Sequence, residues 1–435
     1  MNRLLSLPLL LAVLTASATE TPPDALKSAL DRAKKAHSPV LVEFHAPWCY
    51  SCYYMAKNVQ TGAEWDKVEH AMVVVGFDVD SPEGAQVKQA LHVKALPSYV
   101  VLDSKGEELG RILAEQTRAE FYKKIDEISA RSTSLDDLRS KVKDDSAASV
   151  SAGREVLASY LARNDAAGGI AWQAQLPEPA RAALEKDPQS ALLSKRLVFL
   201  SASQSKDANT CLVSGQAVLE GDLGCDRYYE LEKYMDCAAD RPADEQKRLL
   251  SSQRPAMDKL IANHVLSKSP TCADERTAVL VGADLYAKLG DKKAEQSVLD
   301  RAIKRVQKQM AGNLKKDRNL ADNERVYLDR AGRAKELDAF FVKLIAAYPD
   351  DYVYNFRCGK ILLARGEAGK ALPYFEKSAE KAYGQNRLAV AQYRAQALIK
   401  LGRRDEAKKV AADALSQNGP WFPEDAAKLK ELVKS

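Results

Sequence analysis

Val40-Leu-Val-Glu-Phe-His-Ala-Pro-Trp-Cys-Tyr-Ser-Cys52 joins an apolar run to two cysteines three residues apart. Residues 40–44 are typical of a buried strand, and Pro47 ends the run. We therefore expect both cysteines on the first turn of a helix, where free N–H groups and the helix dipole favour a thiolate at Cys49. Cys52 would lie close enough to attack any mixed disulfide that Cys49 forms. The pattern predicts a thiol–disulfide exchange site.

Residues 1–18 have the pattern of a cleaved signal peptide. Arg3 precedes an apolar run over residues 4–14, and Ala16-Ser17-Ala18 matches the small residues of a cleavage site. The run is shorter than the ~20 residues that a membrane-spanning helix needs, and no later stretch is apolar enough to span a bilayer. We expect cleavage near Ala18, a mature chain without a membrane span, and export, most simply to a bacterial periplasm.

The charge distribution argues against a nucleic-acid partner. The chain has 65 Lys and Arg residues against 60 Asp and Glu residues, a net charge of +5 over 435 residues. Positive and negative residues interleave along helical segments, which is typical of solvated helix faces.

The expected export bears on the oxidation state of the remaining cysteines. In an oxidising compartment, structural disulfides persist and close dithiol pairs serve redox chemistry. Setting the close pair aside leaves five cysteines, so at least one thiol is free or pairs between molecules: Cys211, Cys225, Cys237, Cys272 and Cys358. A zinc site is an alternative for Cys49 and Cys52, but no second CxxC or paired histidine lies at ligand spacing, and we expect no metal and no cofactor. An inert structural disulfide is the other alternative.

Residues 19–130 have the element order of a layered α/β domain. Besides the helix at the cysteines, helices are expected over residues 25–35, 82–91 and 117–129. Strands are expected over residues 40–44, 71–78, 98–102 and 109–113. The second strand is apolar enough to be buried on both faces, and the last two form a hairpin around a turn that contains Gly106.

The stretch Glu43-Phe-His-Ala-Pro-Trp-Cys-Tyr-Ser-Cys52, together with Leu96-Pro97-Ser98, resembles the thioredoxin superfamily. The resemblance covers about the first quarter of the mature chain. The segments Cys52-Tyr-Tyr-Met55, Phe77-Asp-Val-Asp80 and residues 103–108 are similar to one branch, the C-terminal periplasmic domain of DsbD-type reductases and related exported proteins.

The resemblance implies a role for each of five residues. Cys49 would be the exposed nucleophile and Cys52 the more buried resolving thiol. Glu43 would lie beneath them as the proton acceptor for Cys52, with a pKa raised by desolvation. Pro97 would be a cis-proline facing the dithiol, next to a backbone edge that pairs with an extended substrate. Trp48 would pack beside the sulfurs and exclude water.

Three positions depart from the thioredoxin pattern. Tyr50-Ser51 replaces Gly-Pro, Glu43 replaces Asp, and Lys57 replaces a helix-kinking proline. The dipeptide between the cysteines tunes the reduction potential, which spans roughly −120 to −270 mV in such proteins. Because Tyr50-Ser51 carries no positive charge, we expect a moderately reducing couple. Reductase, oxidase and isomerase roles all stay open.

Residues 131–270 are expected to be helical, with a polar linker or exposed helix over residues 131–151. Gly221-Asp-Leu-Gly224 could fold one helix back on the next and bring Cys211 to Cys225. We therefore favour the pairs Cys211–Cys225 and Cys237–Cys272 among three possible pairings.

Residues 271–435 resemble an array of tetratricopeptide repeats. Gly290, Gly332, Gly366 and Gly402 each lie between two amphipathic segments, and the last three are spaced near the 34 residues of that repeat. Small residues at the paired-helix positions would let the helices approach closely. Cys358 falls at a buried helix position and is the expected lone, inert thiol. A plain helical bundle is the alternative.

The sequence thus predicts a thioredoxin-like α/β domain followed by an all-α helical-repeat region. The function that it favours is an exported thiol–disulfide oxidoreductase with protein substrates or redox partners, bound in part by the repeats. The alternative is a helical-repeat scaffold in which the thioredoxin-like domain is mainly a protein-binding module.

Overall fold

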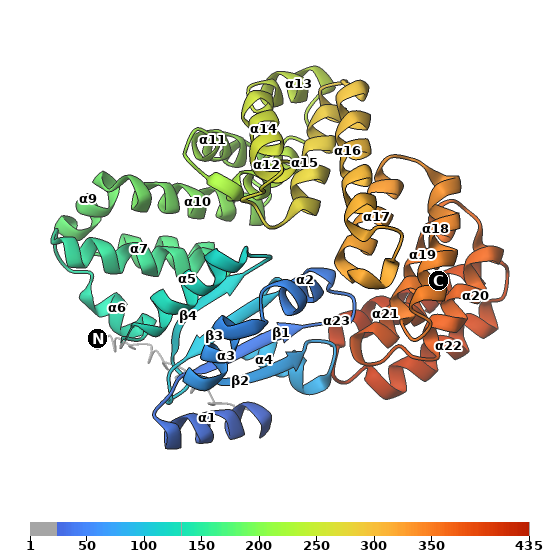
Figure 1. Cartoon of the computed structure of the whole chain (residues 1–435), viewed down its shortest axis with the longest axis horizontal. Coiled ribbons are helices and arrows are strands. Elements are labelled where there is room, and N and C mark those ends of the chain that lie inside the picture. The colour runs from blue at the N-terminus through green and yellow to red at the C-terminus, as the bar shows by residue number, and fades with distance from the viewer. Residues whose placement is uncertain (1–23, 132, 435) are drawn as a thin grey trace, which may run out of the picture.

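The computed structural model describes residues 24–131 and 133–434. An α/β unit comes first, and helices fill the rest of the described chain (Figure 1). The predicted signal peptide, residues 1–18, lies outside the described residues. The predicted fold class, a thioredoxin-like α/β domain followed by an all-α region, is confirmed.

A four-stranded sheet forms the centre of the α/β unit, in the order β2-β1-β3-β4. Its strands are β1 (Val40–His45), β2 (Val73–Asp78), β3 (Ser98–Leu102) and β4 (Glu108–Leu113). β1 pairs in parallel with β2 and antiparallel with β3, and β3 and β4 form the predicted hairpin. Helices pack on both faces of β2, as predicted, but β2 is an edge strand and its first residues are only half-buried.

Two helical layers cover the sheet because side chains alternate between its faces. The helices are α1 (Asp24–Ala36), α2 (Tyr50–Asn58), α3 (Gly62–Ala71), α4 (Pro82–Ala90) and α5 (Arg118–Ser129). Val40, Val42 and Phe44 pack on one face with residues of α1 and α4. Leu41 packs on the other face with residues of α2, α3 and α5. Glu43 alternates with Val42 and Phe44, and this places it on the face covered by α2.

The remaining helices run from α6 to α23. The first group is α6 (Leu135–Lys141), α7 (Ala147–Ala162), α8 (Ala166–Ala174), α9 (Glu178–Lys186), α10 (Pro188–Gln204), α11 (Ala208–Leu219), α12 (Arg227–Cys237), α13 (Ala243–Ser251) and α14 (Arg254–Leu260). The second group is α15 (Glu275–Lys288), α16 (Lys292–Met310), α17 (Arg318–Arg330), α18 (Ala334–Ala347), α19 (Tyr352–Ala364), α20 (Ala368–Ala379), α21 (Gly384–Lys400), α22 (Arg404–Asn418) and α23 (Pro423–Lys434).

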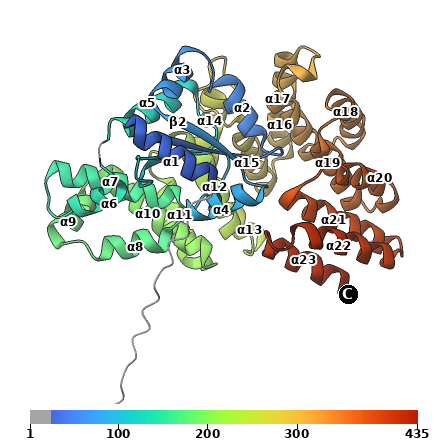
Figure 2. The same cartoon turned by 90° about the horizontal axis from the view of Figure 1, so that it is seen from below.

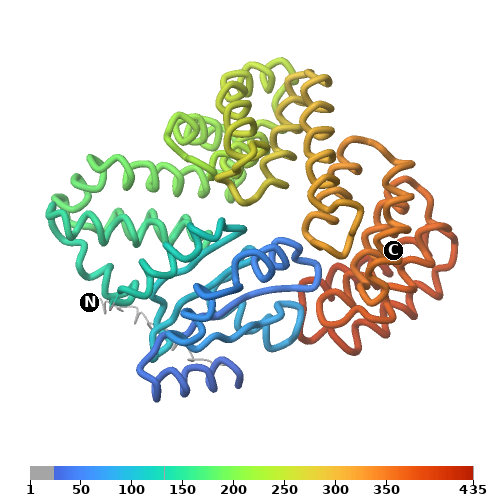
Figure 3. The backbone as a smooth tube through the Cα atoms, in the orientation of Figure 1, coloured from blue at the N-terminus to red at the C-terminus, as the bar shows by residue number. Residues whose placement is uncertain are grey.

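These helices form an arc that returns to the α/β unit. The backbone tube passes from α6–α10 through α11–α16 to α17–α23 (Figure 3). Two perpendicular views show the α/β unit with α6–α10 on one side and α17–α23 on the other (Figures 1 and 2). The arc contacts the α/β unit at β4, through α6 and α7, and at α2, through α17. At its far end, the Gln385 backbone N–H donates to the Asp80 backbone carbonyl at 3.2 Å.

The second group contains the predicted helical hairpins. The four glycines Gly290, Gly332, Gly366 and Gly402 each join two successive helices with φ between 67° and 84°, a conformation that glycine adopts without steric cost. Within the α19–α20 hairpin, a Cβ on Gly359 would lie 2.6 Å from the Phe375 ring. The absence of a side chain at Gly359 therefore lets the two helices approach closely, as the repeat pattern predicts.

The predicted pairing of the middle cysteines was wrong. The disulfides join Cys211 to Cys237 and Cys225 to Cys272. Cys211 lies in the first turn of α11, and at 1.5 Å per residue the rest of that helix carries the chain about 12 Å away before Cys225 is reached. α12 packs back against α11 and returns Cys237, its last residue, to Cys211. Cys358 is free and buried, as predicted.

The interpretation of residues 131–151 as a linker or exposed helix was also wrong. α6 and the start of α7 occupy this segment. Leu135, Leu138 and Val142 pack into a core shared with residues of α7 to α10. The segment has few apolar side chains, but the spacing of these three puts them on one side of the chain.

Candidate dithiol site

Cys49 and Cys52 lie at the N-terminus of α2, where the sequence places them. They form a disulfide with their Cα atoms 5.3 Å apart. Cys49 is the N-cap residue of the helix, and the Cys52 amide donates to the Cys49 sulfur at 3.2 Å. This amide, with the helix dipole, would stabilise a thiolate at Cys49 after reduction of the disulfide.

Glu43 lies in a cavity behind Cys52. The cavity has a volume of about 340 Å³, and Glu43, Cys52, Gln60 and Tyr99 are among its lining residues. The Gln60 amide donates to the Glu43 carboxylate. Burial raises the pKa of Glu43 to about 7, although the Gln60 hydrogen bond lowers it. A carboxyl group with this pKa can gain or lose a proton near neutral pH.

Pro97 and Trp48 are the other two predicted site residues. The Leu96–Pro97 peptide bond is cis, and Leu96 packs against the same apolar cluster as Cys49 and Cys52. Trp48 is 38% exposed and its indole N–H donates to the Asp80 carboxylate at 2.9 Å. Burial raises the pKa of Asp80 to about 6, and the Trp48 hydrogen bond opposes the rise. The indole is thus fixed at the surface next to the dithiol.

The expected order of exposure of the two cysteines is reversed. Cys49 is only 5% exposed, whereas Cys52 is half-buried and lines the cavity. Cys49 packs in an apolar cluster of the α/β unit, and its two neighbours in the sequence contact the helical region. The Trp48 carbonyl accepts a hydrogen bond from the Arg357 guanidinium at 3.0 Å, and Tyr50 is 1% exposed.

Both residues between the cysteines face the helical region. The Tyr50 hydroxyl donates to Asp351 at 3.3 Å, and its ring packs 5.6 Å from that of Tyr354. Ser51 is hydrogen-bonded to Glu115, whose other partner is the Asn319 amide at 3.0 Å. Residues of α17 and α19, or next to them, therefore complete the surroundings of the CxxC motif.

The residues of the helical region that surround the motif were not predicted from the sequence. The set also includes Arg318, which lies 5.8 Å from the centre of the Tyr50 ring, and Asp322, which pairs with Arg357. Arg318, Asp322, Asp351 and Arg357 lie about 270 to 310 positions after the cysteines along the chain. Their local pattern is that of ordinary helix-surface charges. A usable signal is the aromatic Tyr50 inside the CxxC motif, because tyrosine is enriched at interfaces, where its ring is buried and its hydroxyl finds a hydrogen-bond partner.

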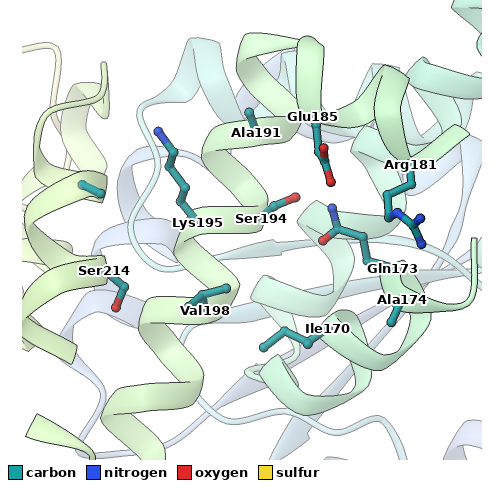
Figure 4. A pocket seen from close by; sticks show the side chains of 11 residues that line it. Ile170, Gln173, Ala174, Arg181, Glu185, Ala191, Ser194, Lys195, Val198 and Ser214 are labelled. Carbon is teal, nitrogen blue, oxygen red and sulfur yellow. The ribbon is translucent and has the colours of Figure 1, made fainter. Parts of the chain in front are cut away.

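A second cavity lies away from the dithiol, among α8 to α11. Its volume is about 530 Å³, and Figure 4 shows Gln173, Arg181, Glu185 and Lys195 among its lining side chains. No cysteine lines it, so it belongs to a different part of the molecule from the candidate site.

Comparison with known proteins agrees with this geometry. A model of the thioredoxin-like domain family matches residues 26–129. The chain is similar to the thioredoxin-like protein HCF164, chloroplastic, of Arabidopsis thaliana, with 28% identity over 116 residues. That match covers 26% of this chain and 43% of the relative's length.

Residues 26–129 are therefore a thioredoxin-like domain that carries a CxxC pair at disulfide distance, and this supports a redox role at the level of the domain family. Among solved structures, a tetratricopeptide repeat protein from Parabacteroides merdae has 14% identity and a TM-score of 0.40, and the match covers 66% of this chain and 99% of that one. Within residues 24–131 and 133–434, no helix is both long and apolar enough to cross a membrane.

Proposed function

We propose that this protein is an exported thiol–disulfide oxidoreductase that exchanges disulfides with protein partners. The observation that carries the proposal is the Cys49–Cys52 pair at the N-terminus of α2, with the titratable carboxyl group of Glu43 in the cavity behind it.

The exchange follows from the two thiols. In the reducing direction, the Cys49 thiolate attacks a partner disulfide, forms a mixed disulfide and releases one partner thiolate. Cys52 then loses its proton and attacks the Cys49 sulfur, which releases the second partner thiol and leaves the Cys49–Cys52 disulfide. Two electrons pass to the partner, and a dithiol reductant must restore the pair.

Three further residues assist in this proposal. Glu43 accepts the Cys52 proton, for which a pKa of about 7 suits it. Pro97 and the adjoining Leu96 backbone hold an extended partner segment against the dithiol. Trp48, fixed by Asp80, shields the sulfurs from water on one side.

The proposal assigns a task to each region of the chain. Residues 1–18 direct export to a periplasm, and residues 19–130 carry the dithiol. Residues 131–270 connect that domain to the repeats, and residues 271–435 bind partners. The disulfides Cys211–Cys237 and Cys225–Cys272 support an oxidising compartment. The helical hairpins support a role in binding proteins, because such arrays offer extended surfaces.

A trapping experiment tests the proposal. In a Cys52→Ser variant, an active exchanger accumulates mixed disulfides through Cys49, which non-reducing electrophoresis and mass spectrometry detect. A Cys49→Ser, Cys52→Ser variant is the matched control. Absence of trapped partners, together with failure of the wild-type protein to reduce insulin, would refute the proposed enzymatic function.

A second function is favoured by the burial of Cys49. With 5% of that residue exposed, the thioredoxin-like domain could serve mainly as a protein-binding module within a helical-repeat scaffold. The same experiment distinguishes the two, because a scaffold retains its partners in both variants without covalent trapping.

A further inference from the structure

Arg357, on α19, contacts the backbone and the side chain on either side of Cys49. Its guanidinium donates to the Trp48 carbonyl at 3.0 Å and lies 4.5 Å from the centre of the Tyr50 ring. At this distance a cation is attracted to the ring face. One side chain of the helical region thus holds both neighbours of the candidate nucleophile.

The charges around Arg357 do not cancel. The Asp322 side chain is fully buried and forms ion pairs with three cations, Arg276, Arg325 and Arg357. The three guanidinium groups outweigh burial and lower the pKa of Asp322, so its charge is −1 at neutral pH. This group therefore has a net charge of +2. A separate pair, Arg318 and Asp351, is neutral as a whole.

The carboxyl groups on the α/β side offset this charge only in part. Burial raises the pKa of Glu43 to about 7, so it is partly protonated at neutral pH. Burial also raises the pKa of Glu115, the partner of Ser51. Asp80, with a pKa of about 6, is ionised but is bound to the Trp48 indole. Tyr50 and Tyr354 have pKa values raised by burial and stay neutral.

We propose that Arg357 is a positioning residue of the dithiol, which fixes the Trp48–Cys49–Tyr50 turn and, with the net positive charge of its cluster, stabilises the Cys49 thiolate. This inference rests on the proposed redox function. A stabilised thiolate favours the reduced form, so the helical region makes the couple more oxidising than the uncharged Tyr50-Ser51 dipeptide would alone. The cation that the motif lacks is supplied by α19.

Two variants of the full chain should shift the couple in opposite directions. Arg357→Gln removes a positive charge and should increase the equilibrium constant for oxidation by glutathione disulfide about tenfold, or about 30 mV toward reducing potentials. Asp322→Asn removes the negative charge and should decrease that constant. The pH midpoint of Cys49 alkylation should rise by about one unit in the first variant and fall in the second. Arg365→Gln, which changes an arginine at the end of α19 that pairs with Asp338, is the matched control.

A second arginine keeps the inference testable if Arg357→Gln or Asp322→Asn fails to fold. Arg318 lies 4.6 Å from the Tyr53 ring and 5.8 Å from the Tyr50 ring, and its side chain is 24% exposed. Arg318→Gln should shift the equilibrium constant in the same direction as Arg357→Gln but less, and Arg357→Lys should stay within about threefold of wild type. Equal potentials in wild type and Arg357→Gln, or shifts of one sign in Arg357→Gln and Asp322→Asn, would overturn the inference. A wild-type protein that does not exchange with glutathione would instead overturn the proposed function.

Discussion

Replacement of Glu43 by glutamine should stabilise the α/β domain at high pH and slow its exchange chemistry. In the folded protein the pKa of Glu43 is raised from 4.5 to about 7 by burial. The folded state therefore binds a proton more tightly than the unfolded chain, and stability is lost as the pH rises through this interval. At ~1.4 kcal/mol per pKa unit, the ionised carboxylate costs about 3 kcal/mol at pH 8 but only about 1 kcal/mol at pH 5.

Glutamine has a similar shape and no charge, so Glu43→Gln should remove this cost. Urea unfolding of the oxidised protein, followed by Trp48 and Trp65 fluorescence in a background whose other two tryptophans are phenylalanine, should give a variant more stable than wild type by about 3 kcal/mol at pH 8 and about 1 kcal/mol at pH 5. Glu107→Gln, on an exposed turn, is the control and should change stability equally little at both pH values.

The same variant tests the proton transfer. Without the carboxylate, release of the partner from the Cys49 mixed disulfide should slow by about 10²-fold at pH 7. Stopped-flow measurement of single-turnover reduction gives this rate. A stability change of equal size at pH 5 and pH 8, or an unchanged rate of release, would refute the reasoning from burial.

Two further predictions concern the helical region. Peptide mapping without reduction should find the Cys211–Cys237 link, and its removal by a Cys211→Ala, Cys237→Ala variant should cost about 3 kcal/mol in unfolding free energy because it opens a loop. Gly359→Ala should cost about 1–3 kcal/mol, measured by urea unfolding, since the added Cβ would meet the Phe375 ring, whereas Gly369→Ala, with open space around it, should be neutral or slightly stabilising.

The parts of the fold that the sequence predicts are those set by local pattern. The buried strand at residues 40–44, the helix that begins after Cys49, and the hairpin around Gly106 each depend on a few neighbouring residues. The raised pKa of Glu43 also follows locally, because a carboxyl group in a buried strand loses its hydration. The four interhelical glycines predict the helical hairpins from local pattern in the same way.

The predictions that were wrong depend on contacts between distant segments. The pairing of Cys211 is set by how α12 returns along α11, and residues 131–151 gain their role from α7 to α10. The contacts of Trp48 and Tyr50 depend on α19, whose Arg357 lies 309 positions from its partner Trp48. No window of sequence around the motif contains that information.

The chemistry of the CxxC motif therefore depends on residues of the α/β unit and of the helical region. In an excised fragment over residues 24–131, the Tyr50 ring would lose Tyr354 and Arg357 and enter water, and Ser51 would keep Glu115 without Asn319. Glu115 would then be hydrated, its pKa would fall toward its ordinary value, and a negative charge would replace the positive cluster beside the dithiol. Both changes disfavour a thiolate at Cys49, so the fragment should be more reducing than the intact protein. A reduction potential measured on the fragment would thus describe the dithiol with Tyr50-Ser51 and a hydrated Glu115, and the difference from the full chain would measure what the helices contribute.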